Sequence, residues 1–196
     1  LTWNPIEFTD MTGHWAEEAV NNLGSRMVVS GTGSHRYEPD RNVTRAEFVA
    51  MIVRGLGLRF EPADHHTFTD VNPSDWYYRS VQTAYRMGFT HGFEDGSFRP
   101  DDNITREQAM FIVAEAMALT PLQNVTETPN ATVDPLHPFT DADRVSTWAV
   151  EGVANSIKAG IIAGKEANRL APQDHTTRAE VAWIIQRLLQ QAELIH

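Results

Sequence analysis

Three arginines stand at equivalent places in the sequence and could bind an anion. Each follows a threonine, and each lies at the same spacing from a preceding tryptophan: Arg45, Arg106 and Arg178. A guanidinium can hold a carboxylate through two parallel hydrogen bonds, and each charged hydrogen bond contributes about 1.5 to 3 kcal/mol. These arginines are therefore the first candidates for a binding site. A salt bridge to a neighbouring carboxylate of the chain is the alternative.

Aromatic residues and glycines recur in the same register and could complete such a site. The aromatic candidates are Trp15, Trp76 and Trp148, joined by Tyr77, and the glycines are Gly31, Gly92 and Gly164. Aromatic rings offer amphipathic walls to the apolar faces of sugars, and a glycine lets a ligand approach the backbone. Packing alone would also explain the register of the tryptophans, and we favour a core role for them over a sugar platform. The glycines are first of all turn residues.

Metal and catalytic chemistry find little support in the residue types. The chain has no cysteine, which excludes a disulfide framework, a thiolate zinc site and a cysteine nucleophile. Among the eight histidines, no pair has ligand spacing on a helix with a third ligand to match, and His65 and His66 fall in a linker. No acidic residue stands out from the repeated pattern as one of a glycosidase pair. We therefore expect no metal, no cofactor and no enzyme activity, with a polysaccharide hydrolase as a distant alternative.

Composition narrows the class of partner. The 196 residues are 41% hydrophobic, so the chain can bury a core, and 16 basic against 26 acidic residues give a net charge of -10. Such a balance is a poor match for a phosphate backbone, so we expect no nucleic acid partner. No apolar run approaches the 18 or more residues of a membrane helix, so we expect no membrane insertion. Because the sequence opens at Leu1 without a basic-then-apolar leader, we expect a mature product or a fragment.

The landmarks repeat three times along the chain. Phe-Thr-Asp begins at Phe8, Phe68 and Phe139, and in each copy the tryptophan, glycine, proline and Thr-Arg pair follow in order. We divide the chain into repeats 1–59, 60–120 and 121–196, with 121–138 as a linker rich in Thr, Pro and Asn. The aspartates of the Phe-Thr-Asp motif are expected to be turn or cap residues ahead of the first helix.

Each repeat is predicted to contain two helices joined by a turn-rich loop. The first starts near the tryptophan, and the second starts at Thr-Arg, where a Glu or Gln at the third place after the threonine indicates a capping box. The second helices are apolar over much of their circumference, so we expect an all-α fold in which they form a central three-helix bundle of pseudo-threefold symmetry. Ile52, Val113 and Ile185 should then be buried. The free backbone N–H groups of the first turn should favour an anion beside each arginine.

The motifs together resemble the S-layer homology (SLH) domain. The resemblance rests on Phe98–Asp101 (Phe-Arg-Pro-Asp), Ile104–Glu107 (Ile-Thr-Arg-Glu), and Thr-Arg-Ala-Glu at Thr44–Glu47 and Thr177–Glu180. Three tandem copies look like the trimer that anchors surface proteins to the envelope of Gram-positive bacteria.

The resemblance implies a three-pronged spindle fold, secretion to the cell surface and non-covalent binding of a secondary cell wall polymer attached to peptidoglycan. It also implies recognition of a pyruvylated N-acetylmannosamine in grooves between repeats, with Arg45, Arg106 and Arg178 as principal ligand residues. The alternative is a structural or protein-binding helical repeat without a carbohydrate ligand.

Overall fold

The fold is built from short helices. A computed structural model describes residues 5–60, 67–122 and 134–195, so His65, His66 and most of the predicted linker lie outside the described residues. The described ranges contain six α-helices: α1 (Glu17–Ser25), α2 (Arg45–Gly55), α3 (Tyr78–Arg86), α4 (Arg106–Met117), α6 (Val150–Lys158) and α7 (Arg178–Gln191). They also contain the 3₁₀ helices η1 (Ala142–Arg144), η2 (Thr147–Ala149) and η3 (Glu166–Asn168). Within those ranges β-structure is confined to isolated bridges, which confirms the predicted all-α class.

The second helix of each repeat begins where the sequence predicts. Thr44 accepts a hydrogen bond from the backbone N–H of Glu47 at 3.2 Å, and the Glu47 carboxylate accepts one from the Thr44 N–H at 3.0 Å. The same reciprocal pair forms at the start of α4 and of α7. Because this arrangement satisfies two backbone donors that the helix itself leaves free, it fixes the first residue of each helix.

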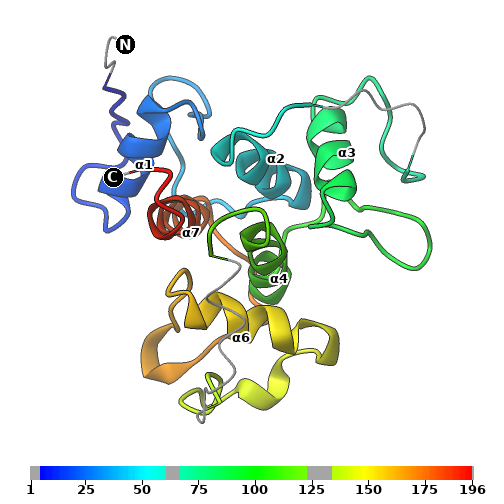
Figure 1. The fold of residues 1–196 in the computed structure, drawn as a ribbon. Helices are drawn as coiled ribbons and strands as arrows, with labels where there is room; N and C mark the ends of the chain where they lie inside the picture. Colours follow the sequence, from blue (N-terminus) through cyan, green and yellow to red (C-terminus); the bar gives the residue numbers. More distant parts are fainter. Residues whose placement is uncertain (1–4, 61–66, 123–133, 196) are drawn as a thin grey trace.

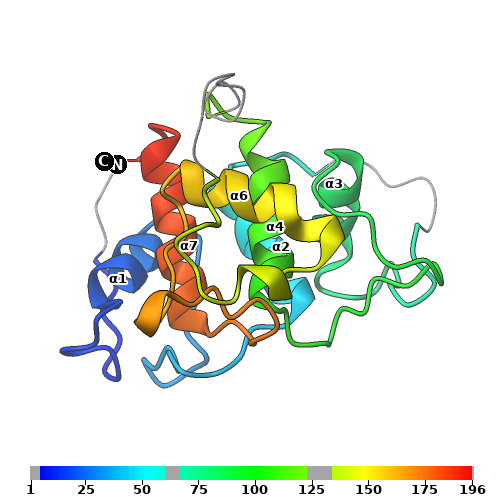
Figure 2. The same cartoon turned by 90° about the horizontal axis from the view of Figure 1, so that it is seen from below.

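The three second helices meet at the centre of the molecule. Figure 1 shows α2, α4 and α7 together in the middle, with α1, α3 and α6 outside them, and α2 contacts both α4 and α7. Seen from below, the three central helices run side by side (Figure 2). Ile52, Val113 and Ile185 are fully buried, as predicted. The spindle outline of the family stays a prediction.

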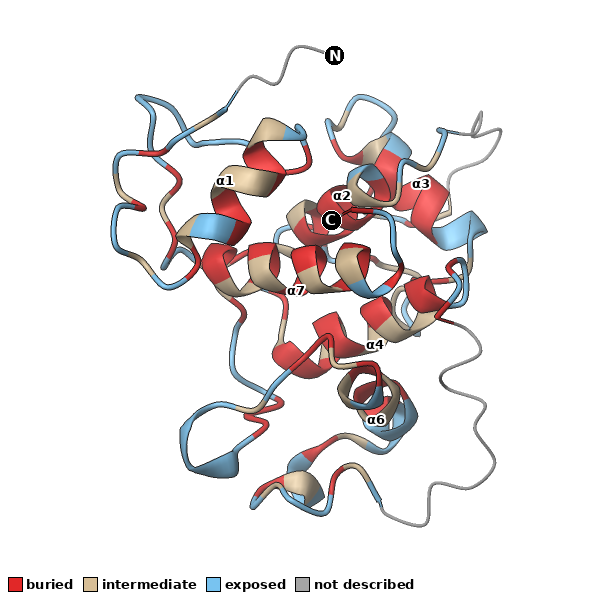
Figure 3. Ribbon diagram, turned by 60° about the vertical axis from the view of Figure 1, so that its left-hand side comes forward, coloured by how far each residue is buried: buried red, intermediate tan, exposed pale blue. Residues whose placement is uncertain are grey.

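The outer helices pack across repeat boundaries. α3 packs on α2, α6 on α4, and α1 on α7, so each first helix lies against the second helix of the preceding repeat in a closed cycle. At one of these contacts a side chain on Gly152 would come 3.0 Å from the Phe111 backbone, so glycine at this position allows α6 to approach α4 closely. Burial follows the same pattern, with the buried faces of the outer helices turned toward the centre (Figure 3). The three repeats therefore share one core.

A ring of backbone hydrogen bonds joins the three repeats just ahead of the central helices. Val43 donates to the Thr176 carbonyl, Thr176 to the Ile104 carbonyl and Ile104 to the Val43 carbonyl, at 2.9 to 3.0 Å. All three residues are fully buried. The ring places the starts of α2, α4 and α7, and hence their arginines, around one axis.

The first-turn N–H groups of the central helices are already bonded within the protein. Arg45 and Ala46 donate to the carbonyls of Asp102 and Pro100 in the next repeat, at 2.9 and 3.1 Å. The corresponding donors of α4 and α7 bond the same way to the repeat that follows in the cycle. The expectation that these N–H groups are free for an anion is therefore wrong, because the neighbouring repeat satisfies them. Any anion must be held by side chains.

Candidate functional site

The loop between the two helices of each repeat is held by the aspartate of Phe-Thr-Asp. Asp70 accepts hydrogen bonds from the backbone N–H groups of Phe98 and Arg99, both at 2.8 Å. Asp10 and Asp141 bond the corresponding pair of their own repeats. The second donor of each pair has a positive φ: 56° at Arg99, 58° at Glu38 and 48° at Ala171. The aspartates lie in turns ahead of the first helix, as expected, and their side chains also stabilise a strained loop.

These hydrogen bonds also act on the ionisation of the aspartates. Burial opposes the charged form of Asp10 and Asp141, but the backbone N–H groups bonded to each carboxylate outweigh it and lower the pKa of both. The carboxylates therefore stay charged at neutral pH and keep the loop in place.

The three glycines of the register are required by packing. A side chain on Gly31 would come within 2.7 Å of the Phe8 ring and 2.8 Å of the Arg36 carbonyl oxygen. Gly92 and Gly164 meet the phenylalanine of their own repeat in the same way. The phenylalanine of each Phe-Thr-Asp motif thus rests directly on a glycine, which fixes the loop that carries the glycine.

Each predicted arginine reaches into the loop of the next repeat. The Nε atoms of Arg45, Arg106 and Arg178 donate to the carbonyl oxygens of Phe98, Leu170 and Tyr37 at 2.9, 2.8 and 2.7 Å. The arginines are 5%, 5% and 4% exposed, so they are buried at the interfaces between repeats. Within the described ranges, the salt-bridge alternative applies to Arg106 alone, whose Nη1 lies 3.7 Å from Glu180. The Nε bonds hold each guanidinium in a fixed orientation at its interface.

The terminal nitrogens of the arginines differ from one another. Nη2 of Arg178 donates to the Ser30 carbonyl at 2.6 Å, and Nη2 of Arg106 to the Ala163 carbonyl at 3.2 Å. Among the residues that the structure describes, the terminal nitrogens of Arg45 have no hydrogen-bond partner, and the guanidinium lies 4.8 Å from the ring centroids of Phe93 and Phe98. Burial lowers the pKa of Arg45 to about 10, which still leaves the group charged at neutral pH.

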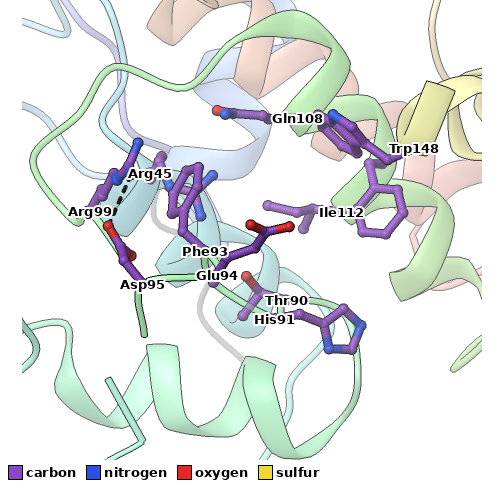
Figure 4. Close-up of a pocket in the computed structure, with 12 residues that line it drawn as sticks. Arg45, Thr90, His91, Phe93, Glu94, Asp95, Arg99, Gln108, Ile112 and Trp148 are labelled. Atoms are coloured by element: carbon purple, nitrogen blue, oxygen red, sulfur yellow. Dashed lines mark hydrogen bonds and ion pairs between the residues drawn. The ribbon is translucent and has the colours of Figure 1, made fainter. Parts of the chain in front are cut away.

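A groove of about 710 Å³ lies beside Arg45, and we call it the Arg45 groove. It is lined by Arg45, residues 90–95, Arg99, Gln108, Phe111, Ile112 and Trp148. Figure 4 shows Phe93 between Arg45 and Arg99 at one end and Trp148 at the other, with Ile112 between them and the Glu94 carboxylate facing the space. The groove thus joins a buried cation to a wall of apolar and aromatic side chains.

A second groove of about 480 Å³ lies beside Arg178, and we call it the Arg178 groove. It is lined by Ser30, Gly31, Thr32, Glu38, Arg41, Glu47, Met51, Arg54, Trp76 and Arg178. Eight of these ten positions correspond by the repeat to a position lining the Arg45 groove, and the exceptions are Arg41 and Arg54. In each groove the arginine, the glycine and the tryptophan come from three different repeats: Arg45, Gly92 and Trp148 in one, Arg178, Gly31 and Trp76 in the other.

The tryptophans are not in the core. Trp15, Trp76 and Trp148 are 62%, 62% and 53% exposed, so the core role that we favoured for them is wrong. They stand just before the first helices and point outward, because smaller residues such as Ala19 and Val20 fill the buried face of α1. Trp76 and Trp148 each line a groove.

Tyr77 and Gly164 line neither of these two grooves. Tyr77 is buried and packs edge-on against Trp76, with ring centroids 5.3 Å apart. Burial, together with the nearby Asp75, raises the pKa of Tyr77 to about 12. The buried Tyr77 ring thus packs against Trp76 and supports it.

Sequence reasoning did not single out several residues that line the grooves. Phe93 and Ile112 of the Arg45 groove and Arg41 of the Arg178 groove belong to no motif, and Gln108 and Glu47 were predicted only as capping-box residues. The signal that could have found them is the register itself. The position just after the repeat glycine is Thr32, Phe93 or Lys165. The third position after the capping threonine is Glu47, Gln108 or Glu180, so the residue type changes between copies at both positions.

Two other kinds of site are absent from the described residues. No group of three or more His, Asp or Glu side chains lies close enough to hold a metal ion in that part of the chain. None of the helices described is long and apolar enough to span a bilayer.

The repeats match a known family. The S-layer homology domain matches residues 7–49, 67–110 and 138–182. The chain belongs to this family. SLH domains are non-catalytic modules that anchor proteins to the cell wall, and membership places the chain at the bacterial cell surface.

Related proteins carry the domain as a small part of longer chains. An amylopullulanase of Thermoanaerobacterium thermosulfurigenes is 39% identical over 94% of this chain, which covers 10% of that protein. A surface-layer 125 kDa protein of Lysinibacillus sphaericus is 27% identical over 95% of this chain, which covers 15% of that protein. An undecaheme cytochrome from the S-layer of Carboxydothermus ferrireducens is 15% identical, with a TM-score of 0.46 over 78% of this chain and 18% of that one. That structural likeness is too weak to carry an argument.

Proposed function

We propose that this SLH chain anchors its parent protein by binding a secondary cell wall polymer in the grooves between repeats. We further propose that it recognises a carboxylate-bearing sugar, pyruvylated N-acetylmannosamine, at the end of that polymer. The observation that carries the proposal is the Arg45 groove, where a buried guanidinium, whose terminal nitrogens have no hydrogen-bond partner among the described residues, stands beside aromatic walls. The chain as a whole carries a net charge of -10, so attraction for an anion has to come from a local cation such as Arg45.

The chemistry of the sugar fits that arrangement. A pyruvate ketal presents one carboxylate, which the planar fork of an arginine can bind with two parallel hydrogen bonds. The ketal methyl, the N-acetyl methyl and one ring face are apolar and suit aromatic walls such as Trp148 or Trp76. The negative charge of the whole chain opposes an anionic polymer only weakly, because charges beyond roughly 8 Å are screened at physiological ionic strength.

The test is binding of the chain to purified cell wall sacculi. We expect cosedimentation with intact sacculi, loss of cosedimentation when the polymer is stripped from the peptidoglycan, and competition by released polymer. Equal binding to stripped and intact walls would favour a structural or protein-binding repeat. Release of soluble sugar from the wall would instead indicate a hydrolase.

A further inference from the structure

The three arginine positions have different surroundings even though the repeats place them equivalently. The residue that follows the repeat glycine is Thr32, Phe93 or Lys165 in the three copies. The residue at the third place after the capping threonine is Glu47, Gln108 or Glu180, and this side chain is also part of the helix cap. These two positions decide what each guanidinium faces.

At Arg106 the chain supplies its own counter-ions. Nζ of Lys165 lies 3.2 Å from an Asp174 carboxylate oxygen and 3.6 Å from one of Glu180. Nη1 of Arg106 lies 3.7 Å from that same oxygen of Glu180, while Nε and Nη2 are bonded to backbone carbonyls. An incoming carboxylate would have to displace Glu180 from both cations, so this position is already occupied by protein.

At Arg178 the occupation is partial. The Glu47 carboxylate forms an ion pair with Nη2 of Arg41 at 2.7 Å. This pair neutralises the charge of Glu47, although the carboxylate still lines the Arg178 groove. Arg178 donates one N–H of Nε and one of Nη2 to backbone carbonyls, which leaves both N–H groups of Nη1 and the second N–H of Nη2. A carboxylate bound through Nη1 and Nη2 would therefore share Nη2 with the Ser30 carbonyl.

At Arg45 the guanidinium faces no carboxylate from the capping position, because Gln108 is neutral. Both terminal nitrogens remain available within the described part of the chain. Phe93 is stacked between two cations, with its ring centroid 4.8 Å from the Arg45 Cζ and 3.9 Å from the Arg99 Cζ. Across the groove, Trp148 packs edge-on against Phe111 at 5.5 Å between centroids. Cationic and apolar surfaces are therefore both open to a ligand.

We propose that the Arg45 groove is the principal binding site for a carboxylate-bearing sugar, and that the Arg106 position is closed by Lys165 and Glu180 and binds none. In the Arg45 groove the carboxylate lies on the terminal nitrogens of Arg45, and the apolar substituents of the sugar face Phe93, Phe111 and Trp148. The Arg178 groove binds more weakly. The inference rests on the proposed function, and deepens it by ranking its sites.

One carboxylate lining the Arg45 groove bears on this proposal. Glu94 is exposed and faces the groove (Figure 4). Asp95, next to it, is bonded to Arg99 at 3.1 Å and to Ser97. Glu94 therefore either repels the carboxylate of a bound sugar or accepts a hydrogen bond from one of its hydroxyl groups. The attraction for the sugar carboxylate must come from Arg45.

The test compares two matched substitutions, Arg45→Lys and Arg106→Lys, in the full chain. Both arginines are equally buried and open a capped helix, so the two changes remove the same planar fork from the same kind of interface. The probe is the methyl glycoside of pyruvylated N-acetylmannosamine, titrated calorimetrically. We expect Arg45→Lys to weaken binding about tenfold or more, and Arg106→Lys to change it by less than about twofold. Equal losses in the two variants would overturn the ranking.

A second pair of variants serves if an arginine substitution unfolds the chain. Phe93→Thr gives the Arg45 groove the residue of the Arg178 groove, and Lys165→Thr removes the closing amine. We expect weaker binding from Phe93→Thr, and unchanged affinity or an added weak site from Lys165→Thr. A loss from Lys165→Thr as large as that from Phe93→Thr would contradict a closed third position.

Failure of the ranking and failure of the proposed function give different results. If the wild-type chain binds neither the probe nor intact sacculi, the proposed function is wrong and the ranking falls with it. If the wild-type chain binds and the two arginine variants lose affinity equally, the ranking alone is wrong.

Discussion

The interface arginines are held by carbonyl oxygens, and this determines what they can still bind. A guanidinium has five N–H donors, and its Nε bond to the next repeat uses only one of them. Among the described residues, the terminal nitrogens of Arg45 have no hydrogen-bond partner, Nη2 of Arg178 is bonded to a carbonyl, and Arg106 has such a bond and in addition an ion pair with Glu180. The same residue type in the same register thus has three different capacities for a ligand.

The register predicts the arginines but not their partners. Their position in the first turn follows from the local Thr-x-x-Glu/Gln pattern, which is why Arg45, Arg106 and Arg178 could be named from sequence. The carbonyls that orient them belong to another repeat, far away along the chain, and no local pattern indicates such a contact. The exposure of the tryptophans was missed for a related reason: helical periodicity starts at the helix, and each tryptophan precedes it.

Thr176 offers a test of the backbone ring at the scale of one residue. It is fully buried, its hydroxyl has no hydrogen-bond partner among the described residues, and the other two members of the ring are Val43 and Ile104. Thr176→Val should remove an unsatisfied polar group and raise the free energy of unfolding by about 1 kcal/mol. The change is measured by denaturant unfolding at an unchanged m-value. A destabilised variant would mean that the hydroxyl is bonded in solution.

At the scale of the element, the Phe-Thr-Asp loop depends on glycine in two ways. Gly92 has a φ of +72° and also lies against the Phe68 ring, whereas Gly13 has a φ of +74° and open space where a side chain would begin. Gly13→Ala therefore measures the backbone strain alone, about 1 to 2 kcal/mol. Gly92→Ala adds the displacement of Phe68, and should cost at least about 2 kcal/mol more.

Thermal or denaturant unfolding of both variants separates these two costs. If Gly92→Ala and Gly13→Ala are equally destabilised, the phenylalanine does not depend on the glycine and the loop is looser than described. The sequence predicts glycine as a turn residue at this position. The sequence does not predict the contact between the Phe68 ring and Gly92. Phe68 precedes α3 in the sequence and Gly92 follows it, so no local pattern links them.

At the scale of the whole molecule, the sequence repeat is not the packing unit. The two helices of repeat 60–120, α3 and α4, pack on α2 and α6 of the neighbouring repeats. The apolar stripes of these helices can be read from the sequence, whereas the choice of partner depends on how three repeats close into a cycle. Pseudo-threefold order was therefore predictable and the cross-repeat pairing was not.

An excised repeat should consequently fold poorly. We expect the fragment 68–120 to show less helix by circular dichroism, and a less cooperative melt, than the fragment 39–91 of the same length, which keeps α2 and α3 together. Both should be far less stable than the whole chain, because neither can close the backbone ring. A fragment 68–120 that melts as cooperatively as the whole chain would refute shared folding of the repeats.

We propose that this SLH chain, despite its net negative charge, recognises a carboxylate on the sugar at the end of the wall polymer. Titration of the wild-type chain with N-acetylmannosamine methyl glycoside in its pyruvylated and unpyruvylated forms tests that recognition. We predict that removal of the pyruvate lowers affinity about 10- to 100-fold, the loss expected when one or two charged hydrogen bonds disappear. Equal affinity for the two sugars would contradict the claim and return the arginines to a purely structural role between repeats.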